Sequence, residues 1–305
     1  MSVVVTGANG FIGYHTTNAL LERGTPVKAV DLHTQKLARL AMHDHLRIYQ
    51  LDVTTPAFAN VLEPRDKVLH LAAVAHFVGR ADANKAVHIN VNGTINVLEA
   101  CIHKDAERLV YSSTGSVYAS GVPVPIREDA PLGPSDDNYY GWSKLQAEQW
   151  IRIYHRFIPH VILRYAYVYG PDKDWGAVGA FLKKLAHHES PIVYGGNQTN
   201  DFVYVQDVVQ ANIAALETNY TNQAFNIGTG RATSIRDACE YCIEAMESTI
   251  EARYEPARSF DYPVFVYDIS KANTLLNYVP HWNLLHGIKE MVRVEANRVP
   301  PLQHS

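Results

Sequence analysis

The chain has 305 residues, of which 47% are hydrophobic and 19% are charged, and its formal net charge at pH 7 is −4. A chain of this length can bury one large core, or one core with a smaller appended lobe. The slight negative charge argues against a broad surface for nucleic acid or an anionic membrane, so we expect neither partner. Strand-forming residues begin at position 2 and no apolar run is long enough to span a bilayer, so we expect a cytoplasmic protein.

The first predicted elements are a strand at 2–5, a glycine-rich turn, and a helix near 11–23. The turn has the sequence Thr-Gly-Ala-Asn-Gly-Phe-Ile-Gly and ends at Gly13. Gly7 permits a tight strand-to-helix turn, Gly10 lets the backbone approach a pyrophosphate, and Gly13 lets the helix pack closely on the strand. The phosphates of a dinucleotide would then lie at the positive end of the helix.

Asp31 follows the second predicted strand, at 26–30. This is about the distance at which a strand–helix–strand unit places an acidic side chain against the 2′-hydroxyl of the adenosine ribose. A carboxylate there accepts a hydrogen bond from the hydroxyl and repels a 2′-phosphate. The sequence therefore predicts NAD, rather than NADP, as the cofactor.

Short apolar runs alternate with helical patterns up to about residue 165. Further strands are expected at 46–50, 67–71, 108–113 and 160–164, and further helices near 34–41, 84–103 and 141–157. The alternation predicts an α/β fold with a Rossmann-type doubly wound parallel sheet, in which ligands bind beyond the carboxyl ends of the strands. We assign the NAD-binding domain to residues 1–164, with 201–227 and about 262–278 returning to it.

Beyond about residue 165 glycine and proline interrupt the pattern more often, for example at Gly170-Pro171 and Gly195-Gly196. We expect a smaller C-terminal substrate-binding lobe made of residues 165–200, 228–261 and 279–305. Cys239 and Cys242 form a Cys-x-x-Cys pair inside an amphipathic helical pattern. Because no further ligands stand at matching spacing, we expect a buried structural pair and no metal site.

The strand at 108–113 leads into Thr114, and Tyr140 and Lys144 follow in a helical pattern. A Tyr-x-x-x-Lys spacing puts phenol and ammonium on one face of a helix. The ammonium favours the phenolate, which can take a proton from a substrate hydroxyl as hydride leaves the same carbon. Thr114 can hydrogen-bond the same oxygen.

The same spacing occurs twice more in the chain. Between Tyr169 and Lys173, Pro171 opposes a continuous helix, and Tyr267 ends a strand-like run that precedes Lys271. Tyr140 alone opens an uninterrupted helical pattern downstream of a strand with a Ser/Thr tip. We therefore predict Thr114, Tyr140 and Lys144 as the catalytic residues.

Together these motifs resemble the extended short-chain dehydrogenase/reductase superfamily and its NAD-dependent epimerase/dehydratase family. The resemblance runs through Thr6–Gly13, Asp31, Leu51–Val53, His70–Ala73, Asn90–Thr94, Tyr111–Thr114, Tyr140 with Lys144, Leu163–Tyr165, Tyr169–Pro171, Asp201–Asp207 and Asp268–Ala272. With the glycine-rich turn, it implies NAD contacts from Gly7, Asn9, Gly10, Phe11, Ile12, Gly13, Asp31, Leu32, Asp52, Val53, Leu71, Ala72, Ala73, Asn90, Ser112, Tyr140, Lys144 and Tyr165.

Within the superfamily the chain looks most like nucleotide-sugar epimerases of the UDP-glucose 4-epimerase type. Such enzymes oxidise C4 of the sugar with tightly held NAD, rotate the 4-keto intermediate and return the hydride to its other face. The resemblance implies that Tyr140 is base and then acid, Lys144 its electrostatic partner and ribose anchor, and Thr114 a helper in proton transfer. Gly115-Ser116 stand where related 4,6-dehydratases have an Asp-Glu pair, which disfavours elimination of water.

The substrate residues depart from the family pattern at two positions. Tyr167 stands where the family often has Asn, and Asn200 where it usually has the Arg that meets the nucleotide diphosphate. Losing a guanidinium removes a charge and a bidentate phosphate fork. Arg258 matches a second family arginine, so we expect Thr114, Tyr167, Asn200 and Arg258 to bind a UDP-sugar. Weaker candidates for a compensating cation at this site are Arg231, Lys183 and Lys184.

Two alternatives follow from the same departures. The run Asn200–Tyr204 also resembles the 3β-hydroxysteroid dehydrogenase branch, whose substrates carry no diphosphate, so an NAD-dependent steroid-type or sugar alcohol dehydrogenase is the second hypothesis. A non-catalytic NAD-binding regulator is the third, and the presence of all three catalytic residues opposes it.

A homodimer is also implied by the resemblance. The helices near 84–103 and 141–157 occupy the positions whose outer faces form a four-helix dimer interface in many relatives. Their apolar residues Val97, Ile102, Trp150 and Ile153 fit either that interface or the core.

Overall fold

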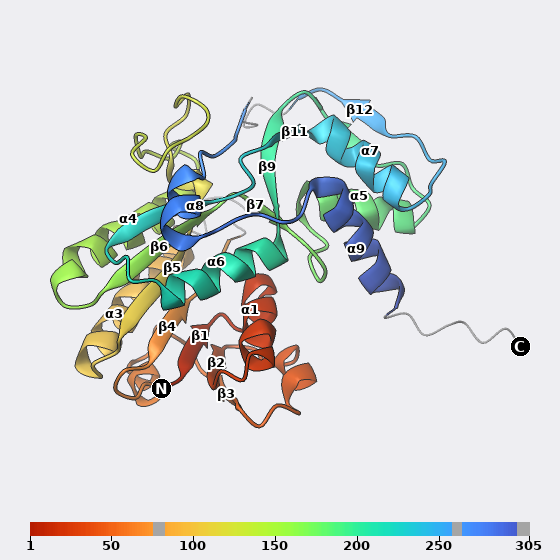
Figure 1. The fold of residues 1–305 in the computed structure, drawn as a ribbon. Coiled ribbons are helices and arrows are strands. Elements are labelled where there is room, and N and C mark those ends of the chain that lie inside the picture. The colour runs from red at the N-terminus through yellow and green to blue at the C-terminus, as the bar shows by residue number, and fades with distance from the viewer. Residues whose placement is uncertain (76–82, 258–263, 298–305) are drawn as a thin grey trace, which may run out of the picture.

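The computed structural model describes residues 1–75, 83–257 and 264–297. A parallel sheet of seven strands lies at its centre, in the order β10-β6-β5-β4-β1-β2-β3 (Figure 1). The strands are β1 (Val3–Thr6), β2 (Val27–Asp31), β3 (Leu46–Gln50), β4 (Lys67–His70), β5 (Arg108–Thr114), β6 (His160–Tyr165) and β10 (Gln223–Ile227). Every residue of β1 is buried, as expected for a central strand of a sheet covered on both faces.

Helices cover both faces of this sheet (Figure 1). On one face α1 (Phe11–Glu22) packs beside α6 (Val205–Glu217), and on the other α3 (Gly93–His103) packs beside α4 (Tyr139–Ile153). The two faces bury separate apolar clusters, one containing Leu20 and Val208 and the other Val97 and Ile151. The predicted doubly wound α/β fold is confirmed.

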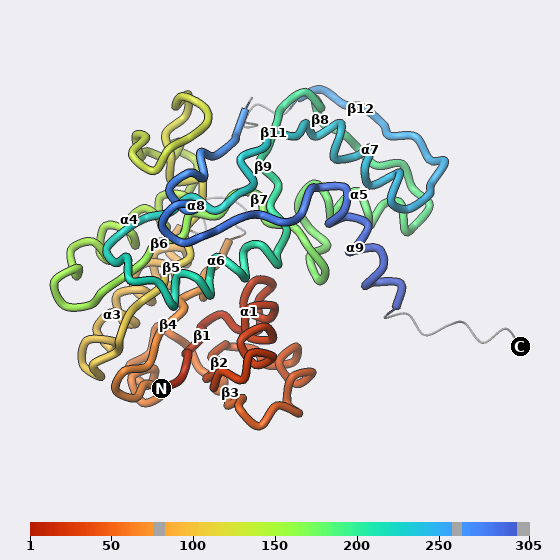
Figure 2. The backbone as a smooth tube through the Cα atoms, viewed as in Figure 1, coloured from red at the N-terminus to blue at the C-terminus, as the bar shows by residue number. Residues whose placement is uncertain are grey.

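A smaller group of elements lies beyond the carboxyl ends of the strands. It contains a three-stranded sheet in the order β11-β9-β7, a strand pair β8–β12, and three helices. The elements are β7 (Tyr167–Tyr169), α5 (Gly176–Ala186), β8 (Ile192–Tyr194), β9 (Thr199–Tyr204), β11 (Ala232–Ser234), α7 (Ile235–Ala245), β12 (Arg253–Glu255) and α9 (Leu284–Ala296). Figure 2 shows the chain passing between the two groups, with α8 (Ser270–Leu276) back beside β10.

Two predicted helices differ from the structure. The helix near 34–41 is a short 3-10 helix, Leu37–Leu40. The helix near 84–103 is divided into α2 (Ala83–Ala86), a π-helical stretch Val87–Asn92 and α3. The wide π turn contains Asn90, whose side chain is fully engaged with other elements, and such turns are frequent at functional sites.

No helix in the described parts of the chain is long and apolar enough to cross a membrane.

Candidate active site

A cleft of about 410 Å³ lies at the carboxyl ends of β1, β4 and β5. Its walls come from the glycine-rich turn, the end of β5, the first turns of α4, β7 and the loop that follows β7. Thr114, Tyr140 and Lys144 all line it. The structure therefore brings the predicted catalytic group and the glycine-rich turn into one cavity.

The glycine-rich turn is packed too closely for side chains. Gly7 has φ of +66°, and a Cβ added there would lie 2.7 Å from the backbone nitrogen of Ala72. A Cβ at Gly13 would lie 2.1 Å from the carbonyl oxygen of Gly7. Gly10 precedes α1 and has no side chain to cap the first backbone N–H groups of the helix, which leaves them available to an anion. The turn therefore fits the diphosphate of a dinucleotide.

Asp31 is held at the end of β2 by two backbone donors. One carboxylate oxygen accepts a hydrogen bond from the Asn9 nitrogen at 2.9 Å, and the other accepts one from the His33 nitrogen at 3.1 Å. The Asn9 side chain accepts hydrogen bonds from the backbone of Lys36 and Leu37 at 2.8 and 3.2 Å. Each carboxylate oxygen keeps a lone pair that can accept a ribose hydroxyl, so this edge of the cleft also fits NAD.

The catalytic group spans the end of β5 and the start of α4. The Asn138 side chain accepts a hydrogen bond from the Gly141 nitrogen at 2.8 Å and caps α4, which places Tyr140 in the first turn. Burial raises the pKa of Tyr140 to about 12, and a hydrogen bond with Thr114 opposes this shift. Burial lowers the pKa of Lys144 to about 7, and the Glu148 charge opposes it. Forming a phenolate here therefore requires positive charge beside the ring.

Asn90 ties three elements together below the cleft. Its amide oxygen accepts a hydrogen bond from the Val74 nitrogen at 2.8 Å, and its amide nitrogen donates to the Val74 carbonyl at 3.0 Å and to the Ser143 hydroxyl at 2.9 Å. Both amide donors are thus used within the protein. Asn90 supports the segment after β4 and the catalytic helix rather than pointing into the cleft.

The predicted cofactor residues fall into two groups. Those that line the cleft are Gly7, Gly10, Phe11, Ile12, Gly13, Leu71, Ala73, Ser112, Tyr140, Lys144 and Tyr165. Those that lie outside its lining are Asn9, Asp31, Leu32, Asp52, Val53, Ala72 and Asn90. Within the second group Val53 is buried in the core cluster on the α3 face, and the Asp52 carboxylate accepts hydrogen bonds from Thr54.

The predicted substrate residues are not all brought together. Tyr167 lines the cleft beside Phe265 and is 44% exposed. Asn200 is only 8% exposed; its strand β9 pairs with β11, and it is not among the residues that line the cleft. Arg258 lies outside the described residues. The cleft also contains Lys173, which the sequence analysis treated only as part of a chance Tyr-x-x-x-Lys spacing.

The buried side chain of His70 contacts the first residue of the glycine-rich turn. His70 ends β4, and its ring nitrogens lie 2.7 Å from the Thr6 hydroxyl and 3.0 Å from the Thr94 hydroxyl. The Thr6 hydroxyl also accepts a hydrogen bond from the Ala72 nitrogen at 3.2 Å. Burial, and secondarily the Lys144 charge, lowers the pKa of His70 to about 3.

This shift predicts a pH dependence of stability. The unfolded chain protonates this histidine near pH 6.5, whereas the folded protein does not until about pH 3. Between these values the unfolded state binds more protons, so the stability from His70 is complete above pH 6.5 and is lost as the pH falls. Replacing His70 with Asn should flatten the dependence of unfolding free energy on pH between 6 and 4 by up to about 1.4 kcal/mol per pH unit. Urea denaturation at several pH values measures this.

The matched control is His45→Asn, because His45 is exposed. The His45→Asn replacement should leave the dependence of the unfolding free energy on pH as it is in the native protein. Equal slopes for the native protein and the His70→Asn variant would contradict the prediction.

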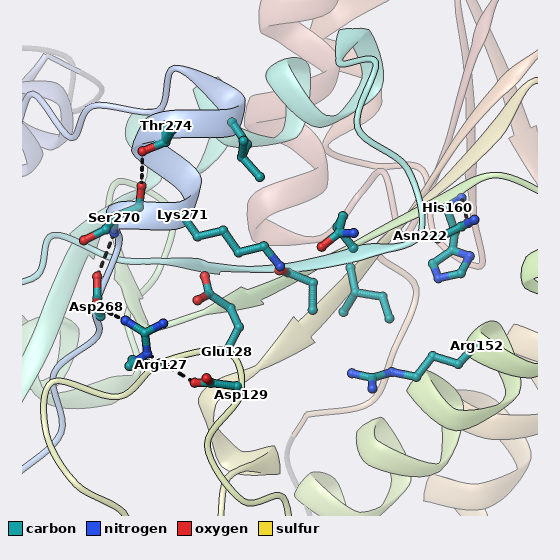
Figure 3. A pocket seen from close by; sticks show the side chains of 14 residues that line it. Arg127, Glu128, Asp129, Arg152, His160, Asn222, Asp268, Ser270, Lys271 and Thr274 are labelled. Carbon is teal, nitrogen blue, oxygen red and sulfur yellow. Dashed lines mark hydrogen bonds and ion pairs between the residues drawn. The ribbon is translucent and has the colours of Figure 1, made fainter.

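A second cavity, of about 680 Å³, lies at the free edge of β10 and contains none of the predicted catalytic residues (Figure 3). Lys271 reaches into it from α8 and Arg152 from α4. The Lys271 ammonium donates to the Ala224 carbonyl at 2.9 Å, and the Glu128 carboxylate accepts a hydrogen bond from the Asn226 nitrogen at 2.9 Å. These side chains satisfy backbone groups of β10, which is the terminal strand of the sheet within the described residues. Their charges therefore protect a sheet edge.

The cysteines are buried in the core. Cys239 and Cys242 lie in α7, and Cys101 lies in α3. Burial raises the pKa of Cys239 to about 11 and raises that of Cys242 as well. Within residues 1–75, 83–257 and 264–297, no three His, Cys, Asp or Glu side chains form a cluster that could hold a metal ion.

Comparison with known proteins decides the family. The family model described as "NAD dependent epimerase/dehydratase family" matches residues 3–228. The chain belongs to this family. It is an NAD-dependent epimerase of the extended short-chain dehydrogenase/reductase superfamily, and its cofactor is NAD. The sequence prediction of an NAD-dependent epimerase is confirmed at this level.

This chain is similar to epimerases whose names give different sugar substrates. It is 30% identical to a UDP-glucuronate 4-epimerase of Thermodesulfobacterium geofontis over 95% of this chain and 94% of the relative. A crystal structure of UDP-glucose 4-epimerase from Thermotoga maritima with UDP-glucose matches with a TM-score of 0.90 at 29% identity, covering 98% of this chain and all of the other. A crystal structure of UDP-glucuronic acid 4-epimerase from Bacillus cereus, in complex with UDP-glucuronic acid and NAD, matches with a TM-score of 0.90 at 30% identity. The match covers 98% of this chain and 100% of the other.

Proposed function

We propose that this epimerase interconverts UDP-glucose and UDP-galactose by transient oxidation at C4 of the sugar. The observation that carries the proposal is the grouping of Thr114, Tyr140 and Lys144 in the same cleft as the glycine-rich turn. Structures of relatives with UDP-glucose and with UDP-glucuronic acid support a UDP-sugar as the substrate class.

The chain's own residues have distinct roles in this reaction. Tyr140 removes the proton of the C4 hydroxyl and later returns a proton to the C4 oxygen, while Thr114 hydrogen-bonds the same oxygen. Lys144 supplies positive charge that favours the phenolate. NAD held at the glycine-rich turn would supply a reversible hydride acceptor for C4 of the sugar. Rotation of the 4-keto sugar between the two transfers inverts the configuration.

The packing around Gly115 opposes the elimination of water carried out by related dehydratases. A Cβ added at Gly115 would lie 2.2 Å from the ring of Phe265 and 2.7 Å from the hydroxyl of Tyr267. An acidic side chain has no room at this position, so the cleft lacks the acid that elimination needs next to Thr114.

The proposal is tested with purified protein. Denaturation should release NAD, and the native protein should convert UDP-galactose to UDP-glucose without net change in the absorbance of reduced nicotinamide. Accumulation of NADH in step with an oxidised product would instead identify a dehydrogenase. UDP-glucuronate and UDP-N-acetylglucosamine, offered in parallel, reveal whether another UDP-sugar is epimerised faster, which would overturn the proposed substrate.

We predict that Asp31 sets the preference for NAD. Its carboxylate is held at the end of β2 and accepts the ribose hydroxyls in this proposal. Replacing Asp31 with Ala should weaken NAD binding roughly ten- to hundredfold, because a hydrogen bond to a charged acceptor contributes about 1.5–3 kcal/mol. Binding of NADP should weaken less, since the repulsion of a 2′-phosphate is removed.

Titration of cofactor-free protein with NAD and NADP measures both effects. Asp44→Ala removes an exposed carboxylate from the loop before β3, at the other end of the β2–β3 pair, and serves as the control. An unchanged ratio of NAD to NADP affinity in the Asp31 variant would refute the assignment.

We infer a homodimer from the outer face of α4. Trp150 is 39% exposed and Ile153 is 61% exposed, and Phe157 is exposed just beyond the helix. A row of large apolar side chains on one face is typical of a surface that is covered by a partner. Val97, which we considered for this interface, is fully buried and belongs to the core.

Replacing Ile153 with Asp should convert the dimer to a monomer in size-exclusion chromatography with light scattering. Val279→Asp places the same charge on an exposed position away from α4 and should leave the dimer intact. A monomeric native protein would refute the inference.

A further inference from the structure

Lys173 lies in the loop between β7 and α5, at the mouth of the active-site cleft. Its ammonium donates a hydrogen bond to the Val168 carbonyl at 2.5 Å. The same nitrogen lies 3.8 Å from the centre of the Trp175 ring and 5.6 Å from the centre of the Phe11 ring. An ammonium has three N–H donors, so two remain for a ligand.

The charge of Lys173 is not balanced within the described protein. Among the described residues that line the cleft, Lys144 and Lys173 are cationic and none is acidic. The flanking carboxylates face other cations: Asp172 lies 3.7 Å from Arg39, and Asp174 lies 3.3 Å from Lys183. Burial lowers the pKa of Lys173 to about 8. An ammonium without an acidic partner in a partly buried position is destabilising unless a ligand supplies the negative charge.

The loop places this ammonium close to the start of α1. Gly170, just upstream, packs against the glycine-rich turn so closely that an added Cβ would lie 3.3 Å from the Phe11 ring. Phe11 is the first residue of α1, whose N-terminus carries partial positive charge and free backbone donors. Two sources of positive potential therefore meet at one end of the cleft, and a diphosphate suits both of them.

Three other cations considered from the sequence, Lys183, Lys184 and Arg231, are not among the residues that line this cleft. Lys183 and Lys184 lie on α5, exposed, and Lys184 pairs with Glu189. Arg231 is exposed and lines a different cavity. Asn200, which stands where relatives have an arginine, is buried in β9.

We propose that Lys173 binds a phosphate oxygen of a diphosphate in this cleft. The diphosphate belongs either to NAD or to the nucleotide sugar, and in the second case the inference rests on the proposed function. In either case the Lys173 ammonium keeps its hydrogen bond to the Val168 carbonyl, and its two remaining N–H groups donate to the phosphate.

The test compares ligand affinities of the Lys173→Met, Lys173→Arg and Lys184→Met proteins with those of the native protein, and Lys184→Met is the control. The thermal unfolding midpoint of each variant shows whether it is folded. One arm measures the affinity of cofactor-free protein for NAD, and the other measures the affinity of the NAD-bound protein for UDP and the KM for UDP-glucose. Lys173→Met should weaken one of these affinities roughly ten- to hundredfold, as expected for loss of a charge-assisted hydrogen bond. Lys173→Arg should retain most of it, and Lys184→Met should match the native protein.

The arm that changes identifies the source of the diphosphate. Affinities for NAD, UDP and UDP-glucose all within twofold of the native values would overturn the proposal. A loss confined to UDP-glucuronate would also overturn it, since the cation would then bind a sugar carboxylate. Because NAD and UDP binding are measured without turnover, a protein that fails to epimerise UDP-glucose still tests Lys173 separately from the proposed function.

Discussion

Replacing Tyr140 with Phe should lower kcat roughly 10²- to 10⁴-fold, the range that positioned acid–base groups contribute. The variant keeps the ring but removes the hydroxyl that hydrogen-bonds with Thr114. Without it no group at this position can take the proton of the C4 hydroxyl. Because Tyr140 lies in the capped first turn of α4, the helix itself should be unaffected. Initial rates with UDP-galactose measure the effect.

The adjacent Tyr139→Phe variant is the matched control. Tyr139 also lies in the first turn of α4, but it is not among the residues that line the cleft. It should keep near-native kcat, and both variants should retain NAD. Full turnover by the Tyr140→Phe protein would remove Tyr140 from the mechanism.

Replacing Glu148 with Ala should lower the free energy of unfolding by about 3–5 kcal/mol, because it leaves a buried charge without its partner. Glu148 and Arg164 are both fully buried. The carboxylate accepts hydrogen bonds from Arg164 at 3.0 and 2.7 Å and from the Ser113 hydroxyl at 2.5 Å. Ser113 precedes Thr114, and Glu148 lies one turn beyond Lys144. Glu148 therefore fixes α4 against β6 through Arg164 and against the end of β5 through Ser113, next to the predicted catalytic residues.

Urea denaturation of the Glu148→Ala, Arg164→Met and double variants gives the coupling between the two residues. The double variant should lose less stability than the sum of the single variants, because it removes both charges together. The exposed pair Lys289–Glu244 is the control: Glu244→Ala should cost less than about 1 kcal/mol. A loss of this small size for Glu148→Ala would refute the prediction.

The parts of the fold predicted well from sequence depend on short-range pattern. The strand–turn–helix at the start of the chain is specified by a short apolar run and by glycines that have no room for a Cβ. The helix expected near 141–157 is also found, as α4 (Tyr139–Ile153), which begins and ends a few residues earlier than expected. The order of such units also restricts the sheet to a parallel, doubly wound arrangement.

The parts predicted poorly depend on contacts between distant segments. The helix expected at 84–103 is interrupted because Asn90 bonds to Val74 and to Ser143, which lie in other elements. Asn200 resembles a substrate ligand in its motif, yet β9 buries it beside β11. Helical periodicity also could not tell whether Val97 faces the core or a partner.

The sequence by itself determined the class of fold and the cofactor, and it predicts the catalytic trio, because each is encoded by residue types at fixed local spacing. The position of Asp31 at the end of β2 and the Tyr140–Lys144 spacing need no knowledge of the rest of the chain. Only the tertiary structure decided which charges enter the cleft. The loop after β7 brings Lys173 onto Phe11, while the exposed Lys183 lies on α5 beside Asp174. The path of a loop over a neighbouring element depends on long-range packing, and one sequence pattern does not specify it.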